Sequence, residues 1–485
     1  WLSGLAMSLG GTLWAGGNWL YKAASLPIIG LAQPQAWYLA EKRRLRQQLR
    51  LGLFTLSLTL LAYFYGDSLL WGLILLGGIL LTAALLLPVL LHHVLNILLA
   101  LSQRFSQWPL VSWFWADSRQ QLPGLSLALM ALLLAQTANI GVGTMTEGFR
   151  LTFTGWLDQR LAADAYIRPT SDEQAKQIIT WLAQQPSVNA ILPSQQISIR
   201  LDGWPVEVSA ITDHSTFRDH WPLLQHKTDA WQQLHQHNHW LISEQLAYRS
   251  DVSVGDRLTI STPKGPLTQT VVGIYADYGN PSGQLIMNRA QFNTIWPDQA
   301  IRSMALRLPA HKVDDLLQQV IQQFDLPSGR ALNQARLKAW SSGVFERTFA
   351  ATSALNSLTL GLAALALLTN LLTLSQTRLP QLAPLWAAGI TPNQLATINL
   401  LQILLLALLT ALLAIPLGLL LAWGLVEVVN VQAFGWRLPL HIFPELFITS
   451  LWLALITAFV AALWPGWQLK KYAAARLIAL LASNR

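Results

Sequence analysis

Three histidines at alternate positions come nearest to the spacing of a metal site. They are His235, His237 and His239, in the segment HQHNHW at 235–240. In a strand, alternate side chains project from one face, and three imidazoles there could bind zinc or copper. The same segment is polar and glutamine-rich, which is typical of a surface loop. We favour the loop and keep the metal site as the alternative.

No other residues have the spacing of a catalytic site. Ser243 and Glu244 are adjacent, but the histidines lie at no spacing that predicts a triad with them. The phosphate-cradling pattern G-x-x-x-x-G-K-S/T is absent from the sequence, and so is cysteine. We therefore expect no enzymatic activity, no cofactor, no disulfide and no thiolate metal site in this chain.

The composition is that of a membrane protein. Of the 485 residues, 53% are hydrophobic and only 12% are charged, whereas about a quarter of the residues in soluble proteins are charged. The net charge is +8, but the basic residues cluster beside apolar runs, as the positive-inside rule predicts. The charge therefore indicates membrane topology, and we expect no nucleic-acid partner.

Apolar runs of about 20 residues predict membrane-spanning helices. The fold class that they indicate is an α-helical transmembrane bundle of about 6–7 spans with a large domain inserted between two of them. The weakest span, 2–22, is interrupted by glycine pairs. The others lie at 51–66, 69–91, 125–146, 353–374, 397–426 and 446–465, and Gly66-Asp67 makes the first two a tight hairpin.

The basic residues favour one orientation of these spans. The segment EKRRLRQQLR at 41–50, Arg378 and the tail at 466–485 are assigned to the cytoplasm, which places region 147–345 outside. The same alternation puts Trp1 near the outer face. We therefore expect the sequence to begin inside a longer protein.

Region 147–345 is long enough to bury a core of its own. Segments 197–211 and 256–276 alternate apolar and polar residues about a turn, which predicts two β-hairpins. Segments 171–185 and 311–326 have helical periodicity, which predicts two amphipathic helices. The region is therefore expected to be an α+β domain outside the membrane.

Two membrane segments have two interpretations each. WFWADSRQQLPG at 113–124 suits a helix lying along the inner interface, or an ordinary aromatic belt. Span 353–374 carries Ser, Thr and Asn residues, which favour helix packing over the lining of a hydrophilic pore.

The connection TRLPQLAPLWAAGITPNQL at 377–395 is longer than a turn needs. Pro380 and Pro384 predict the end of the preceding helix. Apolar residues at a spacing of three to four then predict a separate short amphipathic helix at 377–391. Its apolar face could meet either lipid headgroups or a protein partner.

The end of this connection predicts how the next span begins. Gly389 suits the left-handed residue that ends a helix, with Ile390 as the apolar residue after it. Thr391-Pro392-Asn393-Gln394 predicts a capping box, with Thr as the N-cap, Pro at the first helical position and Gln at the third.

The order of one span, a large outer domain and three further spans resembles that of FtsX/MacB-type ABC transporter permeases, most closely the large bacterial permeases with two FtsX-like units. In that family the loop resembles T-R-x-x-E-x-x-x-L-x-x-x-G. Thr377, Arg378, Gln381, Leu385 and Gly389 occupy those spacings here, and Gln381 departs from the acidic position, so no salt bridge is implied there. Blocks at 147–169, 241–258, 271–292 and 464–480 are also similar to the family.

The resemblance implies a permease subunit in the bacterial inner membrane. A separate cytoplasmic ABC ATPase dimer would bind ATP and push a coupling helix, and mechanotransmission would carry the motion to the periplasmic domain. The cargo would be a hydrophobic substrate or a lipoprotein, and a periplasmic protein partner is a further expectation. The residues implied to couple to the ATPase are Arg378, Gln381, Leu385, Trp386, Gly389 and Ile390.

The resemblance also divides the chain into parts. The expected parts are a partial first unit and basic linker at 1–50, a central transmembrane hairpin at 51–100, an interfacial helix and first span at 101–146, the periplasmic domain at 147–345, three spans with the coupling helix at 346–465, and a cytoplasmic tail at 466–485.

Two other functions are weighed against the permease. A membrane sensor would bind a ligand with its periplasmic domain, but it needs a cytoplasmic output domain that a partner would have to supply. A secondary transporter places ionisable residues and broken helices in mid-membrane, and the well-defined spans have almost no central charge.

Overall fold

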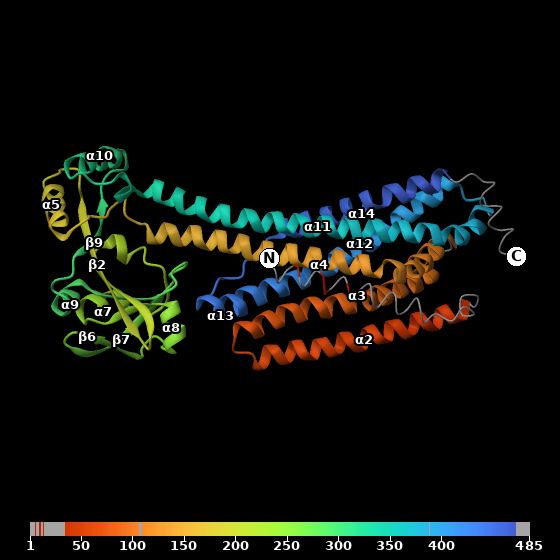
Figure 1. Ribbon diagram of the computed structural model, residues 1–485, viewed down its shortest axis with the longest axis horizontal. Helices are drawn as coiled ribbons and strands as arrows, with labels where there is room; N and C mark the ends of the chain where they lie inside the picture. Colours follow the sequence, from red (N-terminus) through yellow and green to blue (C-terminus); the bar gives the residue numbers. More distant parts are fainter. Residues whose placement is uncertain are drawn as a thin grey trace.

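The computed structural model describes residues 34–105, 109–387 and 389–471, with four isolated positions before residue 34. Figure 1 shows a long helical bundle joined to a sheet-containing domain by α4 (Pro109–Arg160) and α11 (Gln334–Ala387). At about 1.5 Å per residue these helices are roughly 80 Å long, against a bilayer core of about 30 Å. Both therefore extend beyond the membrane to carry the outer domain.

Five helices of the described chain are long and apolar enough to cross a membrane. The expected span at 51–66 is the apolar end of α2, whose first half carries the basic segment, and it is not among the five. The expected span at 2–22 lies outside the described residues, so the count of six or seven is not confirmed. The remaining long helices are α2 (Pro34–Tyr65), α3 (Leu69–Phe105), α12 (Pro392–Trp423) and α14 (Pro444–Lys471).

The separate coupling helix predicted at 377–391 is wrong. The backbone of α11 continues through Pro380 and Pro384 to Ala387. A proline removes one backbone hydrogen bond and can kink a helix, but its fixed φ is helical, so the turns on either side can continue. The predicted coupling residues up to Trp386 therefore lie at the end of one long helix that begins at the outer domain.

The interfacial segment at 113–124 is not a separate helix either. It forms the start of α4, which continues through Pro123. Asp117 and Gln121 on this segment are buried against the bundle. The segment is therefore not a separate helix, and two of its polar side chains pack against protein; its position at the inner interface stays a prediction.

Glycines let α4 and α12 approach closely. A Cβ atom added at Gly418 would lie 2.6 Å from Cβ of Ile140, and one added at Gly141 would lie 2.7 Å from Leu421 Cδ2. Small residues at such crossings allow the van der Waals contact that holds membrane helices together. Leucine and alanine side chains of α3, α4, α11, α12 and α14 complete the buried core of the bundle.

The outer domain is built on a sheet with the strand order β10-β1-β9-β2-β3-β8-β5-β7-β4, and β6 pairs with β7. Its globular part is narrower than the expected 147–345, because α4 continues to Arg160 and α11 starts at Gln334. The strands are β1 (Ala165–Ile167), β2 (Ala190–Leu201), β3 (Trp204–Ile211), β4 (Leu223–His226), β5 (Trp240–Ser243), β6 (Arg257–Thr262), β7 (Gly265–Tyr275), β8 (Gly283–Asn288), β9 (Ile301–Arg307) and β10 (Ala331–Asn333).

Short helices cover the two halves of this sheet. On the half made of β1, β9 and β10, α5 and α10 bury their apolar faces. Towards β7, the covering helices are α7, α8 and α9. Their bounds are α5 (Asp172–Ala183), α6 (Ser215–Arg218), α7 (Ala230–Gln236), α8 (Glu244–Ser250), α9 (Arg289–Ile295) and α10 (Val313–Gln323).

The predicted hairpins and helices of this domain are confirmed. β2 and β3 join through Asp202 and Gly203, with φ of 50° and 80°, which is the left-handed pair that a tight hairpin turn requires. β6 and β7 pair in the same way. The Ser171 side chain accepts a hydrogen bond from Gln174 N and so caps α5.

The glycine crossing yields a test of the bundle. Replacing Gly418 with Val forces its side chain against Ile140, and overpacking of this kind costs about 1–3 kcal/mol. We expect a lower thermal unfolding temperature for Gly418→Val in detergent, measured by intrinsic fluorescence. Gly361→Val is the matched control, because a Cβ added at Gly361 meets nothing within 4 Å. Equal unfolding temperatures for the two variants would contradict this packing.

Candidate functional site

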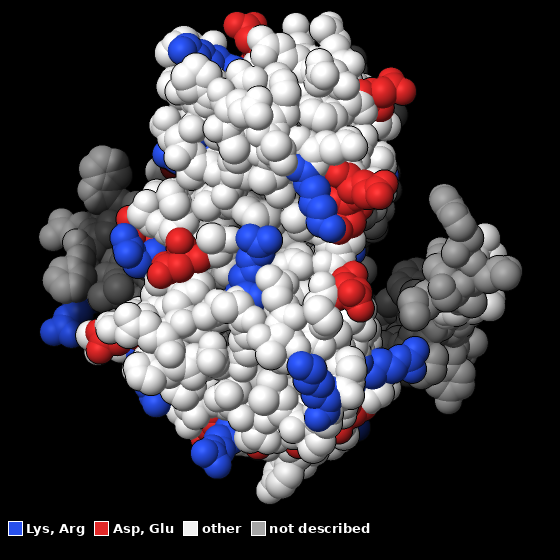
Figure 2. Space-filling model, turned by 90° about the vertical axis from the view of Figure 1, so that its left-hand side faces the viewer, with Lys and Arg blue, Asp and Glu red and all other residues white. Residues whose placement is uncertain are grey.

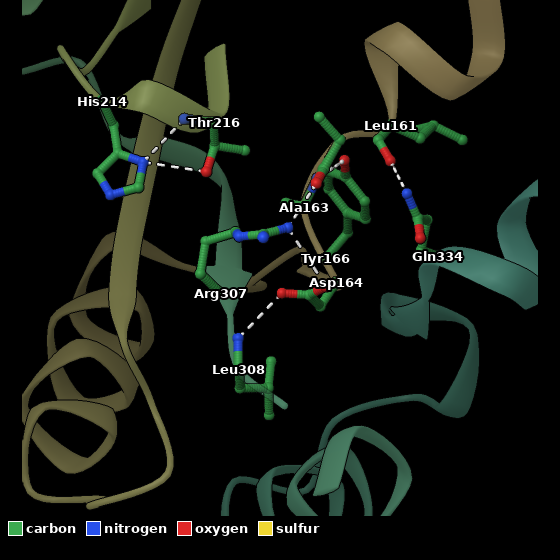
Figure 3. Close-up of polar contacts among 10 residues, drawn as sticks. Leu161, Ala163, Asp164, Tyr166, His214, Thr216, Arg307, Leu308 and Gln334 are labelled. Carbon is green, nitrogen blue, oxygen red and sulfur yellow. Dashed lines mark hydrogen bonds and ion pairs between the residues drawn. The ribbon is translucent and has the colours of Figure 1, made fainter. Parts of the chain in front are cut away.

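The candidate functional site is the set of contacts by which the membrane helices hold the outer domain. Its first part, which we call the root, lies where α4 ends and α11 begins (Figure 3). Gln334 Nε2 donates to Leu161 O, and Gln334 N donates to Asp164 O at 3.0 Å. The first residue of α11 is thereby tied to the chain that leaves α4.

Asp164 extends the root into the sheet. Its carboxylate accepts from Leu308 N at 3.0 Å and from Arg307 Nη1 at 3.3 Å. Arg307 lies at the end of β9 and also donates to Ala162 O at 2.8 Å. The backbone of Ala163 donates to the Tyr166 hydroxyl at 3.1 Å, and burial raises the pKa of Tyr166 to about 12. Both long helices and a central strand therefore meet at one hydrogen-bonded joint.

Ion pairs keep α4 and α11 together below the root. Lys338 Nζ lies 2.6 Å from Asp158 Oδ1, and Arg150 Nη2 lies 3.1 Å from Glu346 Oε2. These side chains are partly exposed, so each pair contributes at most about 1 kcal/mol. Both pairs connect the same two helices between the membrane and the root, so they keep α4 and α11 side by side there even though each contributes little energy.

A cluster of aromatic side chains, which we call the aromatic clasp, forms a second attachment of the outer domain. Phe149, Phe153 and Trp156 extend along α4 at helical spacing. Tyr278 follows β7, and its ring centroid lies 5.1 Å from that of Trp436, in the connection between α12 and α14. Phe149 lies 5.7 Å from Trp436, and Trp156 Nε1 donates to Ala276 O at 2.9 Å. The clasp therefore joins α4, the sheet and the loop between α13 (Asn430–Phe434) and α14, which faces the outer domain.

Polar contacts support the clasp from α8. Glu244 Oε2 accepts from Arg437 N at 3.2 Å, and Gln245 Nε2 donates to Asp277 O. Gly435, which ends α13 (Asn430–Phe434), has φ of +75° and lies against Gln245. A residue with a side chain would be strained in that left-handed conformation, so glycine allows the loop to turn directly onto the domain.

Burial changes the ionisation of the carboxyl group in this contact. The pKa of Glu244 is raised to about 7, mainly by burial and to a smaller extent by the charge of Glu427, while the backbone N–H and the charge of Arg437 oppose the shift. Burial also raises the pKa of Asp277. Since Glu244 contacts the outer loop directly, its charge near neutral pH acts on the attachment between the domain and the membrane helices.

A buried polar cluster joins α4 to α12 at the cytoplasmic end. Gln121 Nε2 donates to Asp117 Oδ2 at 3.0 Å and to Gln402 Oε1 at 2.5 Å, while Gln402 Nε2 donates to Asp117 at 3.0 Å. All three side chains are less than 9% exposed. Gln121 Oε1 is buried without a hydrogen-bond partner, but the three bonds between the side chains fix the register of the two helices.

The predicted capping box is confirmed beside this cluster. Thr391 Oγ1 accepts from Gln394 N at 3.3 Å, and Thr391 N donates to Gln394 Oε1 at 2.9 Å. Gly389 has φ of +95°, the left-handed conformation predicted for a helix end. The backbone at Arg378, Gln381, Leu385 and Trp386 is helical; their side chains lie outside the described part of the structure, and their coupling role stays a prediction.

The three histidines do not form the strand that the metal interpretation needs. His235 lies in α7, with its ring 5.1 Å from that of Trp231. The rings of His237 and His239 stack 6.0 Å apart beyond that helix. Among the described residues, no group of three or more His, Cys, Asp or Glu is arranged to hold a metal ion.

The polar residues of span 353–374 mostly bond within their own helix. Ser357 Oγ donates to Ser353 O at 3.0 Å, and Asn370 Nδ2 donates to Ala366 O at 2.8 Å. Ser353 and Ser357 also line a cavity of about 680 Å³ between α4, α11 and α14. The interpretation favoured from the sequence has these polar residues holding α11 against another helix. The hydrogen bonds of Ser357 and Asn370 stay within α11 and do not support it.

The face at the outer tip of the domain carries no large patch of one charge. In Figure 2 the Lys and Arg side chains are interspersed with Asp and Glu, and most of the surface is neutral. Surfaces that bind polyanions carry basic residues gathered on one face. The visible tip does not have that pattern.

Two family models match the chain. Residues 125–327 match the MacB-like periplasmic core domain, and residues 353–474 match the FtsX-like permease C-terminal domain. The first match covers the outer domain with the helix that leads into it, and the second covers the last three described spanning helices. The chain belongs to the FtsX/MacB-type ABC transporter permeases, which confirms the family indicated by its sequence.

One curated relative is an uncharacterized ABC transporter permease protein of Mycobacterium tuberculosis, 26% identical over 370 residues. The match covers 72% of this chain and 43% of that protein, so the chain spans less than half of the relative's length. Among solved structures, the extracellular domain of the noncanonic ABC-type transporter YknZ from Gram-positive bacteria is 12% identical, with a TM-score of 0.25 over 35% of this chain and 98% of that one. A domain of a putative permease from Porphyromonas gingivalis is 16% identical, with a TM-score of 0.22 over 33% and 71%.

The raised pKa of Glu244 predicts a pH dependence of stability. Between its ordinary value of 4.5 and about 7, the folded chain holds a proton that the unfolded chain releases, so the free energy of unfolding falls as pH rises through this window. Glu244→Gln should remove part of that fall, on the order of 1–2 kcal/mol. The measurement is the unfolding temperature from pH 4.5 to 8. Glu173→Gln removes an exposed carboxylate on α5 and is the control; identical pH profiles for all three proteins would contradict the shift.

Proposed function

We propose that this chain is the transmembrane subunit of an ABC transporter in the bacterial inner membrane, with its outer domain in the periplasm. A separate cytoplasmic ATPase dimer hydrolyses ATP, and the chain transmits the motion to the outer domain without enzymatic activity of its own. The cargo is a hydrophobic substrate or a lipoprotein that is exported or extracted from the membrane.

The continuity of α11 is the observation that carries this proposal. One helix of 54 residues connects the predicted coupling residues at Arg378–Trp386 with the root at Gln334. Beyond it, Gly389 and the Thr391 capping box set a sharp turn into α12. A displacement of the cytoplasmic end therefore has a direct mechanical path to the sheet. The polar cluster of Asp117, Gln121 and Gln402 supports the same end from α4.

The coupling end can be tested by two substitutions. Leu385→Glu places a charge on the face that would bind the ATPase, and Gly389→Val strains a residue with φ of +95°, at a cost of about 1–3 kcal/mol. Each should lower ATP hydrolysis by the purified complex at least about tenfold, or release an ATPase that is recognised by its phosphate-binding motif.

The control for these variants is Gly343→Val, in the part of α11 that lies outside the membrane. A Cβ added at Gly343 meets nothing within 4 Å, so this variant should keep both the ATPase and its activity. Retention of full, stimulated ATP hydrolysis by Leu385→Glu and Gly389→Val would overturn the coupling role.

The clasp provides a test of domain movement. A Cβ built at Gly435 lies 3.6 Å from Gln245 Cβ, within the Cβ separation of disulfides, about 3.5–4.5 Å. The chain has no cysteine of its own, so Gly435→Cys/Gln245→Cys should form one defined cross-link. We expect the oxidised double variant to lose ATP-driven transport and to regain it on reduction, while the activity of each single variant is the same in both conditions. Transport that continues at the wild-type rate in the fully cross-linked protein would show that the outer domain need not part from this loop.

A further inference from the structure

A cavity of about 730 Å³ opens at the root, between the ends of the two long helices and the sheet. Arg160 and Leu161 from the end of α4 form one wall, and Arg336, Leu337 and Trp340 from the start of α11 form another. Strands β2, β3, β8 and β9 form its floor. This volume is in the range of small-molecule sites, about 300–1,000 Å³.

The charges around this cavity all have one sign. Four arginines line it, and no aspartate or glutamate is among its described lining residues. None of the four forms an ion pair with a described carboxylate. Glu207 lines the neighbouring hollow, where it accepts from Gln196, and the buried carboxyl group of Asp277 lies close enough to Arg160 to interact with its charge. The arginines are Arg160, Arg168, Arg330 and Arg336.

Two of these guanidinium groups are held in place by neutral partners. Arg160 Nη2 donates to Gln284 Oε1 at 2.8 Å, and its guanidinium lies 4.3 Å from the ring centre of Trp221. Arg330 Nη1 donates to Pro169 O at 3.0 Å. Neutral hydrogen-bond partners orient the two groups without neutralising them. Asp277 interacts with the charge of Arg160 from outside the cavity, but the described lining itself carries four positive and no negative side chains, so the cavity favours an anion.

The remaining lining is apolar and partly aromatic. Trp340 is 69% exposed at the rim, which is unusual for so large an apolar side chain outside the membrane. Trp221 and Phe217 form an edge-to-face pair on the opposite wall, with ring centroids 5.9 Å apart. Leu192, Ile211, Ile286, Leu332 and Leu337 complete the apolar lining.

We propose that this cavity binds an acidic amphiphile, that is, a molecule with a phosphate or carboxylate headgroup and a hydrocarbon body. Arginine recognises both anions through paired N–H donors, and the tryptophan and leucine walls would remove the hydrocarbon from water. Arg160 lies about 20 Å beyond the end of the span at 125–146, so a bound molecule has left the bilayer core. That the molecule is cargo rests on the proposed function; the binding itself does not.

The test uses the whole chain in lipid nanodiscs without an ATPase. Diazirine-bearing dodecyl phosphate, the matching fatty acid and the matching neutral alcohol are each cross-linked by light, and labelled peptides are identified by mass spectrometry. We expect the phosphate, the carboxylate or both to label the segments 217–221 and 337–340 several-fold more than the alcohol does. Labelling by the phosphate probe alone would indicate a phosphate headgroup, and labelling by the fatty-acid probe alone would indicate a free fatty acid.

Arg168→Gln/Arg336→Gln should lower this labelling about tenfold or more, because two charge-assisted hydrogen-bonding groups are lost. Both residues are exposed, so the fold should be retained, and the unfolding temperature verifies this. Arg257→Gln removes an exposed arginine on β6 and should label as the wild type does. Trp340→Ala removes apolar surface from the rim and leaves the charge of the cavity unchanged. It should weaken labelling of segment 217–221 by the two acidic probes.

Equal labelling by the alcohol, or undiminished labelling of the double arginine variant, would overturn the proposal. Displacement of the probes by millimolar inorganic phosphate alone would also overturn it, because the apolar wall would then contribute nothing. Failure of the coupling variants at Leu385 and Gly389 to affect ATP hydrolysis would leave this labelling unchanged, so the two proposals fail separately.

Discussion

The hydrogen bonds of Gln334 to Leu161 O and Asp164 O are the constraint on which the rest of the molecule depends. They join the only two connections that lead from the described membrane helices into the sheet. The pairing of β1 with β10 and the two ion pairs between α4 and α11 hold the same two segments together on either side of this joint. The position of the outer domain is therefore fixed by two helices together, and their packing is a property of the whole bundle.

The outer domain is attached at a second point, and the two attachments differ chemically. The root is made of directional hydrogen bonds to backbone groups, whereas the clasp is made mainly of aromatic faces around Trp436. Directional bonds fix an angle, while aromatic contacts tolerate sliding at small cost. A fixed joint beside a permissive one lets a domain rotate in a defined direction.

The sequence predicted the parts of this fold that depend on local patterns. Gly389, the Thr391 capping box and the turn at Asp202-Gly203 act through their own backbones, so neighbouring residues suffice to identify them. Pro380 and Pro384 led to the wrong prediction of a helix end, because a proline weakens a helix but does not by itself end it. The root and the arginine-lined cavity could not be foreseen, since Arg160, Arg330 and Arg336 come together only through the sheet. The clasp had one visible signal, aromatic residues of α4 at helical spacing, but nothing in the sequence named Trp436 as their partner.

The glycine contact between α4 and α12 also determines how far a small movement is carried. Gly141 lies against Leu421, and the 19 residues from there to Arg160 form an uninterrupted helix, about 28 Å long. If α4 tilts by about 10° around that contact, Arg160 is displaced by roughly 5 Å, about one helical turn. The distance between this crossing and the root would then set how far a given tilt of α4 displaces the outer domain.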